Sequence, residues 1–247
     1  MYNGVNCSKK EIIKSNNSIL KAYETKHDDR ISEVVRMLEG EKILDVGCGY
    51  GTISRWCSEQ GYKMHGIDRV EEFILIAKEF NENKNVNFEK RDFMEKKFPA
   101  DSFDGILFLE TIEHVENPAE YIKEFHRILK PNGILIISTP NATALKNMLY
   151  ALSYRKKEKR ESLIQNISNE PKNTGDQLEH IYNWDFPCLS RLVNRCGFNI
   201  TDHSFVGSGP IFLPIFGKRI RMIRGNSRIL NKWPPLMKTQ IIKCKKL

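Results

Sequence analysis

The run from Ile43 to Gly51 constrains the fold of this chain most strongly, because it places three glycines directly after a short apolar stretch: Ile-Leu-Asp-Val-Gly-Cys-Gly-Tyr-Gly. Glycine tolerates positive φ and has no Cβ, so the chain can turn sharply and a ligand can approach the backbone closely. A helix that begins at such a turn directs its first amide groups at that ligand. The run therefore predicts a buried strand, a tight turn and a helix, with a nucleotide-binding site at the turn.

The spacing of the glycines argues against a dinucleotide. The dinucleotide fingerprint needs a third glycine at position 52, where this chain has Thr52. An acidic residue opens the motif instead, and a carboxylate suits a ligand with a cationic amino group and a sulfonium better than a pyrophosphate. The motif Asp-x-Gly-x-Gly-x-Gly resembles motif I of the class I S-adenosylmethionine (SAM) methyltransferases. That resemblance implies a SAM site at Asp45, Gly47, Gly49 and Gly51.

Two further acidic residues stand at the ends of predicted strands. Residues 63–68 predict a short strand that ends at Asp68, about 20 residues past the first glycine, which is the distance expected for a ribose-binding acid. Residues 86–93 predict a third strand that ends in Asp92 and Phe93. In the family that motif I resembles, this pair flanks adenine, so Asp92 would accept from the exocyclic amine and Phe93 would give apolar contact. The alternative is a set of solvated strand-end residues, but their order after the glycine turn favours a cofactor site.

The rest of the core alternates between predicted strands and helices. Residues 103–109 form the continuous apolar run that a buried parallel strand requires. Asn117, Pro118 and Glu120 predict the capped start of a helix. A turn at residues 130–133 then leads into a fifth strand over Ile134 to Ser138. This alternation predicts an α/β fold with a right-handed, doubly wound, Rossmann-like sheet.

Amphipathic helices are predicted on both sides of this core. Apolar residues at helical spacing predict one over residues 31–38, ended by Gly40, and another over residues 185–196. Residues 198–205 and 238–244 are expected to form the last two strands, an antiparallel pair if the topology of the family holds, which completes seven strands. We expect a single domain with four parts: a helical preface (1–40), a SAM-binding core (41–140), a lid or insertion (141–184), and a C-terminal helix with the last strands and a basic apolar segment (185–247).

Composition narrows the class of protein. The 247 residues are 40% hydrophobic, enough for one substantial core. The six cysteines show no CxxC pairing, and with no signal peptide or long apolar segment they predict reduced thiols in a cytoplasmic protein.

The net positive charge of the chain lies in its second part. Residues 1–140 carry 20 Lys and Arg against 24 Asp and Glu, whereas residues 141–247 carry 19 against 7. From Pro210 onward ten basic residues and no acidic ones are interleaved with apolar residues. This mixture predicts peripheral contact with an anionic membrane or a groove for a phosphate-bearing substrate. The alternative is that the basic side chains extend over apolar core residues without any partner.

A second constellation with chemical content follows the fourth predicted strand, at the sheet edge where ligands bind in open α/β folds. It reads Glu-Thr-Ile-Glu-His over residues 110–114. If this edge is helical, Glu110, Glu113 and His114 share one face and could bind Mg²⁺, Mn²⁺ or Zn²⁺, with His180 as a further ligand. The alternatives are that His114 is a general base or a core residue and that Glu110 caps a helix.

The E-x-x-E-H element is similar to that of the ubiquinone-biosynthesis O-methyltransferases. The resemblance implies that Glu110, Glu113 and His114 line the acceptor site and are associated with a divalent metal. The sequence Ser138-Thr139-Pro140-Asn141 and the apolar-basic insertion after it also resemble that group, in which an insertion contacts membrane-borne acceptors. We expect residues 141–180 to form a mobile lid.

Two other methyltransferase groups share parts of this pattern. The small-RNA 2′-O-methyltransferases have the same element and a later histidine before aromatic residues, which His180, Tyr182 and Trp184 would match. The basic residues here cluster with aliphatic ones rather than with stacking groups, and this disfavours nucleic acid. Methyltransferases of surface-glycan and lipid-linked sugar pathways are also similar. All three groups methylate a hydroxyl, so we expect O-methylation of a small-molecule, lipid-linked or sugar acceptor; a catalytically inactive SAM-fold binding protein is the alternative.

The chemistry follows from SAM. Its sulfonium makes the methyl carbon electrophilic, so the protein chiefly has to align an acceptor lone pair. The acceptor hydroxyl must also lose its proton, which His114 could take as general base or which a metal held by Glu110 and Glu113 could ease. These roles exclude each other for His114, because a metal-bound nitrogen cannot accept a proton. Glu110, Glu113 and His114 are therefore the predicted catalytic residues.

Overall fold

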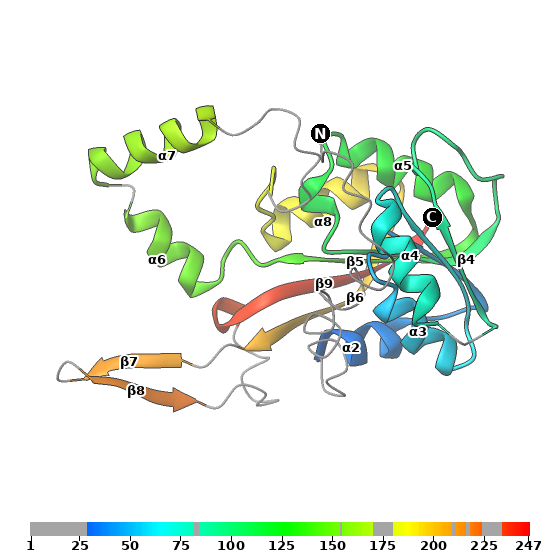
Figure 1. Cartoon of the computed structure of the whole chain (residues 1–247), viewed down its shortest axis with the longest axis horizontal. Coiled ribbons are helices and arrows are strands. Elements are labelled where there is room, and N and C mark those ends of the chain that lie inside the picture. The colour runs from blue at the N-terminus through cyan, green and yellow to red at the C-terminus, as the bar shows by residue number, and fades with distance from the viewer. Residues whose placement is uncertain are drawn as a thin grey trace.

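A seven-stranded sheet forms the centre of the computed structural model, with the strand order β3-β2-β1-β4-β5-β9-β6 (Figure 1). The structure describes residues 29–81, 84–153, 155–169, 180–208, 211–215, 218–223 and 234–247. The strands of this sheet are β1 (Lys42–Val46), β2 (Lys63–Asp68), β3 (Val86–Lys90), β4 (Phe103–Leu109), β5 (Leu129–Pro140), β6 (Phe198–Ser208) and β9 (Met237–Lys246).

The strand directions confirm the predicted α/β fold. Strands β1 to β5 pair in parallel, as a doubly wound Rossmann-like sheet requires. Strand β9 lies antiparallel to both of its neighbours, β5 and β6. The last two predicted strands therefore do form an antiparallel pair. The carboxyl ends of β1, β2, β3 and β4 meet at one edge of the sheet, where the glycine turn and the 110–114 element lie.

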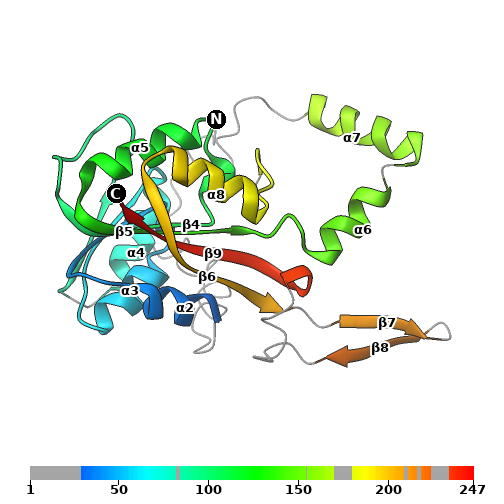
Figure 2. The ribbon, with the colours of Figure 1, turned by 180° about the vertical axis from the view of Figure 1, so that it is seen from behind.

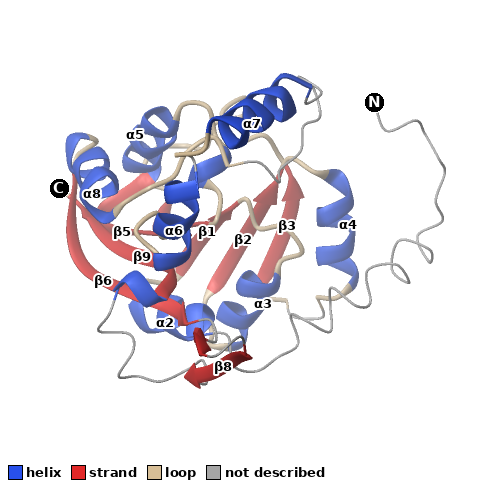
Figure 3. Ribbon diagram, turned by 90° about the vertical axis from the view of Figure 1, so that its left-hand side faces the viewer, coloured by secondary structure: helices blue, strands red, loops and turns tan. Residues whose placement is uncertain are grey.

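Helices cover both faces of the sheet (Figure 3). Helices α5 and α8 pack in the hydrophobic cluster of one face, and α2, α3 and α4 pack in that of the other. Figure 2 shows α8 beside β6 and β9. The helix bounds are α2 (Asp29–Met37), α3 (Thr52–Glu59), α4 (Glu71–Glu79), α5 (Pro118–Ile128), α6 (Leu145–Ser153), α7 (Lys157–Asn169) and α8 (Phe186–Arg195).

Burial on both faces explains the uninterrupted apolar run of β4. Ile106 and Phe108 pack in the cluster below α5, whereas Leu107 and Leu109 pack in the cluster below α2 and α3. Because successive side chains of a strand point to opposite faces, a strand that is covered on both sides needs apolar residues at every position. The sequence pattern of residues 103–109 therefore reports the depth of β4 in the sheet.

Two local predictions need correction. Asn117 does precede α5, but its side chain makes no capping hydrogen bond, so the predicted capping box does not form. The turn at residues 130–133 does not precede the fifth strand but lies within β5, because Leu129 already pairs with Phe103 before Ile134 pairs with Gly105. By contrast, Asp185 caps α8 by accepting from the Cys188 amide at 2.6 Å.

The flanking segments are described in part. Helix α2 matches the helix predicted over residues 31–38, while residues 1–28 of the expected preface lie outside the described residues. The predicted lid contains α6 and α7, and its residues 170–179 lie outside the described residues. In the basic C-terminal segment it has a two-stranded ribbon, β7 (Ile211–Ile215) and β8 (Lys218–Ile223). Within the part of the chain that is described, no helix is long and apolar enough to cross a membrane.

Candidate functional site

The three glycines of the turn between β1 and α3 all have positive φ, at 75°, 52° and 73° for Gly47, Gly49 and Gly51. Their surroundings differ. A Cβ on Gly47 would lie 2.5 Å from Oγ1 of Thr111, and one on Gly51 would lie 2.3 Å from Cζ of Phe88. A Cβ on Gly49 would meet nothing within 4 Å. Gly47 and Gly51 are therefore required by packing, whereas Gly49 leaves the backbone open to a ligand.

The carboxylates of β1 and β2 bind to this turn and to the helix that follows it. Asp68 accepts from the Gly49 amide at 3.0 Å and from the Val70 amide at 2.9 Å, and burial raises its pKa. Asp45 is only 3% exposed and accepts from Oγ of Ser54 at 2.7 Å. Burial raises the pKa of Asp45 to about 6, and the nearby charge of Asp68 contributes in the same direction. Asp68 thus binds the turn itself, while Asp45 joins β1 to α3.

Asp92 and Phe93 follow β3 at the same edge of the sheet. The amide of Arg91 donates to the carbonyl of Asp68 at 2.9 Å, which joins the ends of β3 and β2. Asp92 accepts from the Met94 amide at 2.9 Å and so closes a turn. The ring of Phe93 is 4% exposed and packs with its centroid 4.9 Å from that of Phe125. In the structure this ring belongs to the core, and its role beside adenine stays a prediction.

Glu110, the first residue after β4, has a φ of +48°. For a residue other than glycine this backbone conformation is strained, and such strain is typical of functional sites. The Glu110 amide donates to the carbonyl of Ser138 at 2.9 Å, and Oγ of Ser138 donates to Oε1 of Glu110 at 2.8 Å. Nη1 of Arg30, on α2, lies 3.9 Å from the same carboxylate oxygen.

The backbone of Glu110 overturns the helical arrangement considered for residues 110–114. The structure has only a short 3₁₀ turn over Ile112–His114, and Glu110 precedes it in the left-handed region. Glu110, Glu113 and His114 therefore do not share a helix face. Glu110 is directed to Ser138 and Arg30, while Glu113 and His114 form a separate group.

Glu113 is the most perturbed acid of this group. It is 1% exposed, and burial raises its pKa to about 7, with the charge of Glu110 as a second cause. Its Oε2 accepts from Oγ1 of Thr139 at 2.8 Å. Its Oε1 is buried without a hydrogen-bond partner among the residues described, and Nε2 of His114 lies 4.0 Å away. A buried carboxylate oxygen in this state is suited to a proton or a cation.

His180 completes the group from a distant part of the chain. Its ring centroid lies 5.0 Å from that of His114. Glu113, His114 and His180 each offer a ligand atom, and these atoms all lie within 4.8 Å of one another. One carboxylate and two imidazoles are a donor set that suits Zn²⁺ or Mn²⁺. Three of the four predicted metal ligands thus come together, and Glu110 is the one that does not.

Two further residues of the site, Arg30 and Thr139, were not predicted from the sequence. Both contact the carboxylates of this site, Arg30 from α2 and Thr139 from the end of β5. For Thr139 a signal was present, because it belongs to the Ser-Thr-Pro-Asn motif that resembles the O-methyltransferases. Arg30 carried no local signal, because its approach to Glu110 depends on how α2 packs on the sheet.

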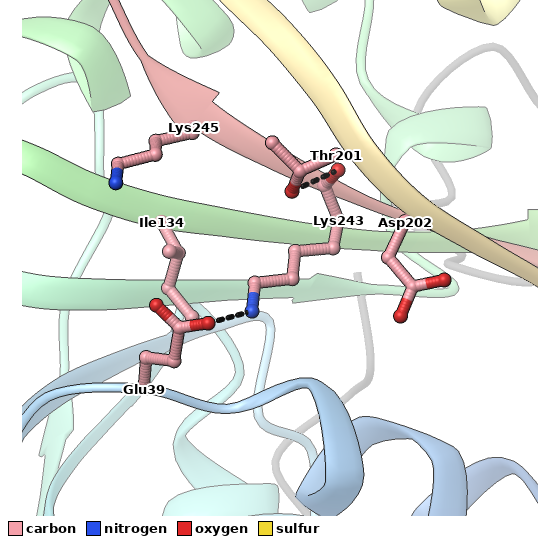
Figure 4. A pocket seen from close by; sticks show the side chains of 6 residues that line it. All are labelled: Glu39, Ile134, Thr201, Asp202, Lys243 and Lys245. Atoms are coloured by element: carbon pink, nitrogen blue, oxygen red, sulfur yellow. Dashed lines mark hydrogen bonds and ion pairs between the residues drawn. The ribbon is translucent and has the colours of Figure 1, made fainter.

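A cavity of about 360 Å³ lies at a different place, beside Glu39 in the segment between α2 and β1 (Figure 4). Lys243 forms an ion pair with Glu39 there, and Asp202 accepts from Nη1 of Arg36 at 2.8 Å. These charges are matched within the protein. The cavity is remote from the glycine turn, which follows β1, and it is lined by Glu39, Ile134, Thr201, Asp202, Lys243 and Lys245.

Comparisons with known proteins agree on the family. A family model described as a methyltransferase domain matches residues 21–203. The chain is 34% identical over 128 residues to the ubiquinone biosynthesis O-methyltransferase of Actinobacillus pleuropneumoniae serotype 5b (strain L20), a match that covers 49% of this chain and 55% of that protein. The chain thus spans about half the length of the curated relatives that it matches.

Solved structures show the same fold. A methyltransferase in complex with the Haloferax volcanii Trm112 methyltransferase activator has a TM-score of 0.62 at 15% identity, with 97% of each chain covered. Magnesium protoporphyrin IX methyltransferase from Synechocystis PCC 6803, with bound S-adenosylhomocysteine (SAH), has a TM-score of 0.57 at 15% identity, with 94% of this chain and 88% of that chain covered.

Proposed function

This chain belongs to the methyltransferase-domain family, of the class I SAM-dependent kind, and from this premise we propose that it transfers the SAM methyl group to a hydroxyl of a small-molecule acceptor. One observation carries the proposal: the glycine turn lies against the segment of residues 110–114, which carries Glu113 and His114. Strands β1 and β4 are neighbours, and the space beside Gly47 is filled by Thr111, within the 110–114 element. A cofactor at Gly49 would therefore lie next to Glu113 and His114.

SAM is proposed to bind at the glycine turn, with Asp68 toward its ribose. The open space at Gly49 and the amide that Gly49 donates to Asp68 support this position. Asp92, which closes the turn after β3, is proposed to lie toward the adenine. The SAH bound to the Synechocystis neighbour supports the choice of cofactor.

The transfer itself is an in-line displacement. The acceptor oxygen forms a bond to the methyl carbon as the bond from that carbon to sulfur breaks, and SAH leaves. The acceptor hydroxyl gives up its proton at the same stage. Glu113 is suited to receive it, because a pKa of about 7 makes its carboxylate a usable base near neutral pH. His114, with Nε2 4.0 Å from Oε1 of Glu113, is the other candidate base.

A divalent metal is the competing account of proton removal. Glu113, His114 and His180 fit such an ion, and the unpartnered Oε1 of Glu113 supports the fit. A bound ion would lower the pKa of an acceptor hydroxyl. Glu110 would then not be a ligand of the ion, and its charge would act only by raising the pKa of Glu113.

An apolar acceptor at a membrane surface is supported by helix α6. Its exposed aliphatic side chains recur at spacings of three and four residues, so they form one stripe. Helix α6 and the β7–β8 ribbon both extend from the sheet on the same side of the molecule (Figures 1 and 2). The ribbon belongs to the segment from Pro210 onward that has ten basic and no acidic residues. We therefore propose a cytoplasmic protein with peripheral contact to anionic membranes.

RNA ribose methylation is the second candidate. It is suggested by His180, Tyr182 and Trp184, which match the later histidine and aromatic residues of the small-RNA enzymes. The rings of Tyr182 and Trp184, however, stack on each other with centroids 5.3 Å apart. This stack already occupies one face of each ring, which disfavours their use as a platform for bases.

The experiment is methyl transfer to a catechol-type phenol by wild-type protein and by the single variants Glu113→Ala, His114→Ala and His180→Ala. Each variant is expected to keep its SAM affinity and to lose methyl transfer by about 10²-fold or more. Glu116→Ala, an exposed change in the same segment, is the matched control and should keep full activity. Full activity in all three site variants would rule the proposed site out.

A chelator separates the two ways of removing the proton. If a strong chelator stops turnover and Mg²⁺, Mn²⁺ or Zn²⁺ restores it, the metal account holds. If turnover survives chelation, the proton goes to Glu113 or His114 directly.

A further inference from the structure

Gln240, a buried residue of the last strand, is linked to the site by a hydrogen bond to the backbone of Trp184. Gln240 is fully buried on β9 and continues the inward row of Ile242 and Cys244, which pack in the cluster below α5 and α8. It lies directly opposite Thr139 in the β5–β9 ladder. Residues opposite each other on antiparallel strands project to the same face. Gln240 therefore neighbours the threonine that donates to Glu113.

Only half of the Gln240 amide is used. Its Nε2 donates to the carbonyl of Trp184 at 2.7 Å, while its Oε1 is buried and has no hydrogen-bond partner in the described part of the chain. A buried amide oxygen without a partner destabilises a fold, so an apolar side chain of similar length would serve the core at least as well. The carbonyl of Trp184 would not be orphaned by such a change, because the Ala142 amide also donates to it at 3.0 Å. Core stability therefore does not explain the glutamine.

The segment that Gln240 holds is residues 180–184, which has no regular secondary structure. At one end the amides of Ile181 and Tyr182 donate to the carbonyl of Glu113 at 2.8 and 3.2 Å. At the other end the carbonyl of Trp184 accepts from Nε2 of Gln240 and from the Ala142 amide. An irregular segment has no ladder of its own, so bonds of this kind set its path. His180 is its first residue and lies against His114.

We propose that Gln240 is a positioning residue for the acceptor side of the site. Together with the Ala142 amide it holds the carbonyl of Trp184 and so fixes the path of residues 180–184, and this keeps His180 beside Glu113 and His114. The proposal rests on the proposed function, because that function makes these three residues the acceptor site.

The test is Gln240→Met, which keeps the length of the side chain and removes the donor. Amide hydrogen exchange at residues 181–184 is expected to become about tenfold faster relative to the amides of β5, with the melting temperature unchanged or higher. Affinity for Zn²⁺ alone, measured by calorimetry, is expected to fall by about 10- to 100-fold, the usual effect of losing a group that orients a ligand. SAH affinity should not change, and kcat should fall at constant KM for SAM.

The matched control is Ile242→Val, in the same inward row of β9. It should lower the melting temperature and leave the relative exchange of residues 181–184 as in the wild type. If Gln240→Met gives that same pattern, Gln240 is a core residue and the proposal is overturned. If wild-type protein binds no Zn²⁺ or transfers no methyl group, the proposed function is at fault, and the exchange at residues 181–184 still decides the role of Gln240.

Discussion

At the scale of single residues, the glycines of the turn have separable roles. Gly51 is closed in by Phe88 and Gly47 by Thr111, so a side chain at either position collides with the protein itself. Gly49 faces open space, and its amide is bonded to Asp68. A substitution there therefore tests ligand binding rather than packing.

Gly49→Val is expected to fold and to lose SAH binding, because its side chain would fill the space left for the cofactor. The positive φ adds roughly 1–3 kcal/mol of strain to the folded state. Gly61→Val is the control for that strain, since Gly61 has a φ of +97° and no atom within 4 Å of an added Cβ. Calorimetry should show SAH binding in the Gly61 variant and none in the Gly49 variant. Equal affinity in both would mean that the cofactor lies elsewhere.

The raised pKa of Glu113 predicts that the stability of the protein depends on pH. Its pKa in the folded protein, about 7, lies above the ordinary value of 4.5, so between these values the native protein holds a proton that the unfolded chain has released. The free energy of unfolding therefore falls as pH rises through this window. Asp45 contributes in the same direction at lower pH. Glu113→Gln removes only its own part, so the variant should gain roughly 1–3 kcal/mol on the wild type between pH 4.5 and pH 8.

Urea unfolding at several pH values measures this difference. A constant difference between Glu113→Gln and the wild type across the range would show that Glu113 is an ordinary carboxylate. The same titration with Zn²⁺ present should lower the pKa of Glu113 if the ion binds there, because a cation favours the charged form.

At the scale of elements, helix α6 stands out because it exposes large apolar side chains to solvent. Its exposed aliphatic side chains are Leu145, Met148, Leu149 and Leu152, which are 43%, 52%, 58% and 61% exposed. The described side chains of α7 are exposed as well. Both helices fall within the segment predicted to be a lid, and its mobility stays a prediction.

The stripe on α6 predicts membrane binding that a charge would abolish. The double variant Met148→Asp with Leu149→Asp should bind vesicles of anionic and zwitterionic lipid at least about tenfold more weakly than the wild type, because two side chains lose their apolar contact. Its SAH affinity should stay unchanged. The control is Gln60→Asp with Asn87→Asp, which adds the same charge at exposed positions of the SAM-binding region, away from α6. Equal sedimentation of both variants with vesicles would assign the membrane contact, if any, to another surface.

At the scale of the whole molecule, the cofactor should act as a ligand of the folded state. SAH at about 100 times its Kd adds about 2.7 kcal/mol to the free energy of unfolding, which for a chain of this size raises Tm by roughly 5–10 °C. Thermal unfolding with and without SAH measures the shift, and NAD at the same concentration is the control. A Tm that ignores SAH would contradict the SAM site, whereas a shift without methyl transfer would favour an inactive SAM-fold protein.

The sequence by itself determined the features that depend on neighbouring residues. The glycine turn, the order of strands and helices and the buried run of β4 follow from local conformational preferences and hydrophobic spacing, so they could be predicted without the fold. The acids at the ends of β1, β2 and β3 could also be placed at one edge, because parallel strands end together. These features also identify the family.

Only the tertiary structure decided which of the predicted site residues meet. His180 lies beside His114 because backbone hydrogen bonds to Glu113 hold the irregular segment 180–184 in place. No local sequence pattern predicts hydrogen bonds between such distant residues. Glu110 turns away to Ser138, since its positive φ breaks the helical spacing that its neighbours suggested. The raised pKa of Glu113 comes from burial, and burial is a property of the assembled core rather than of any stretch of sequence.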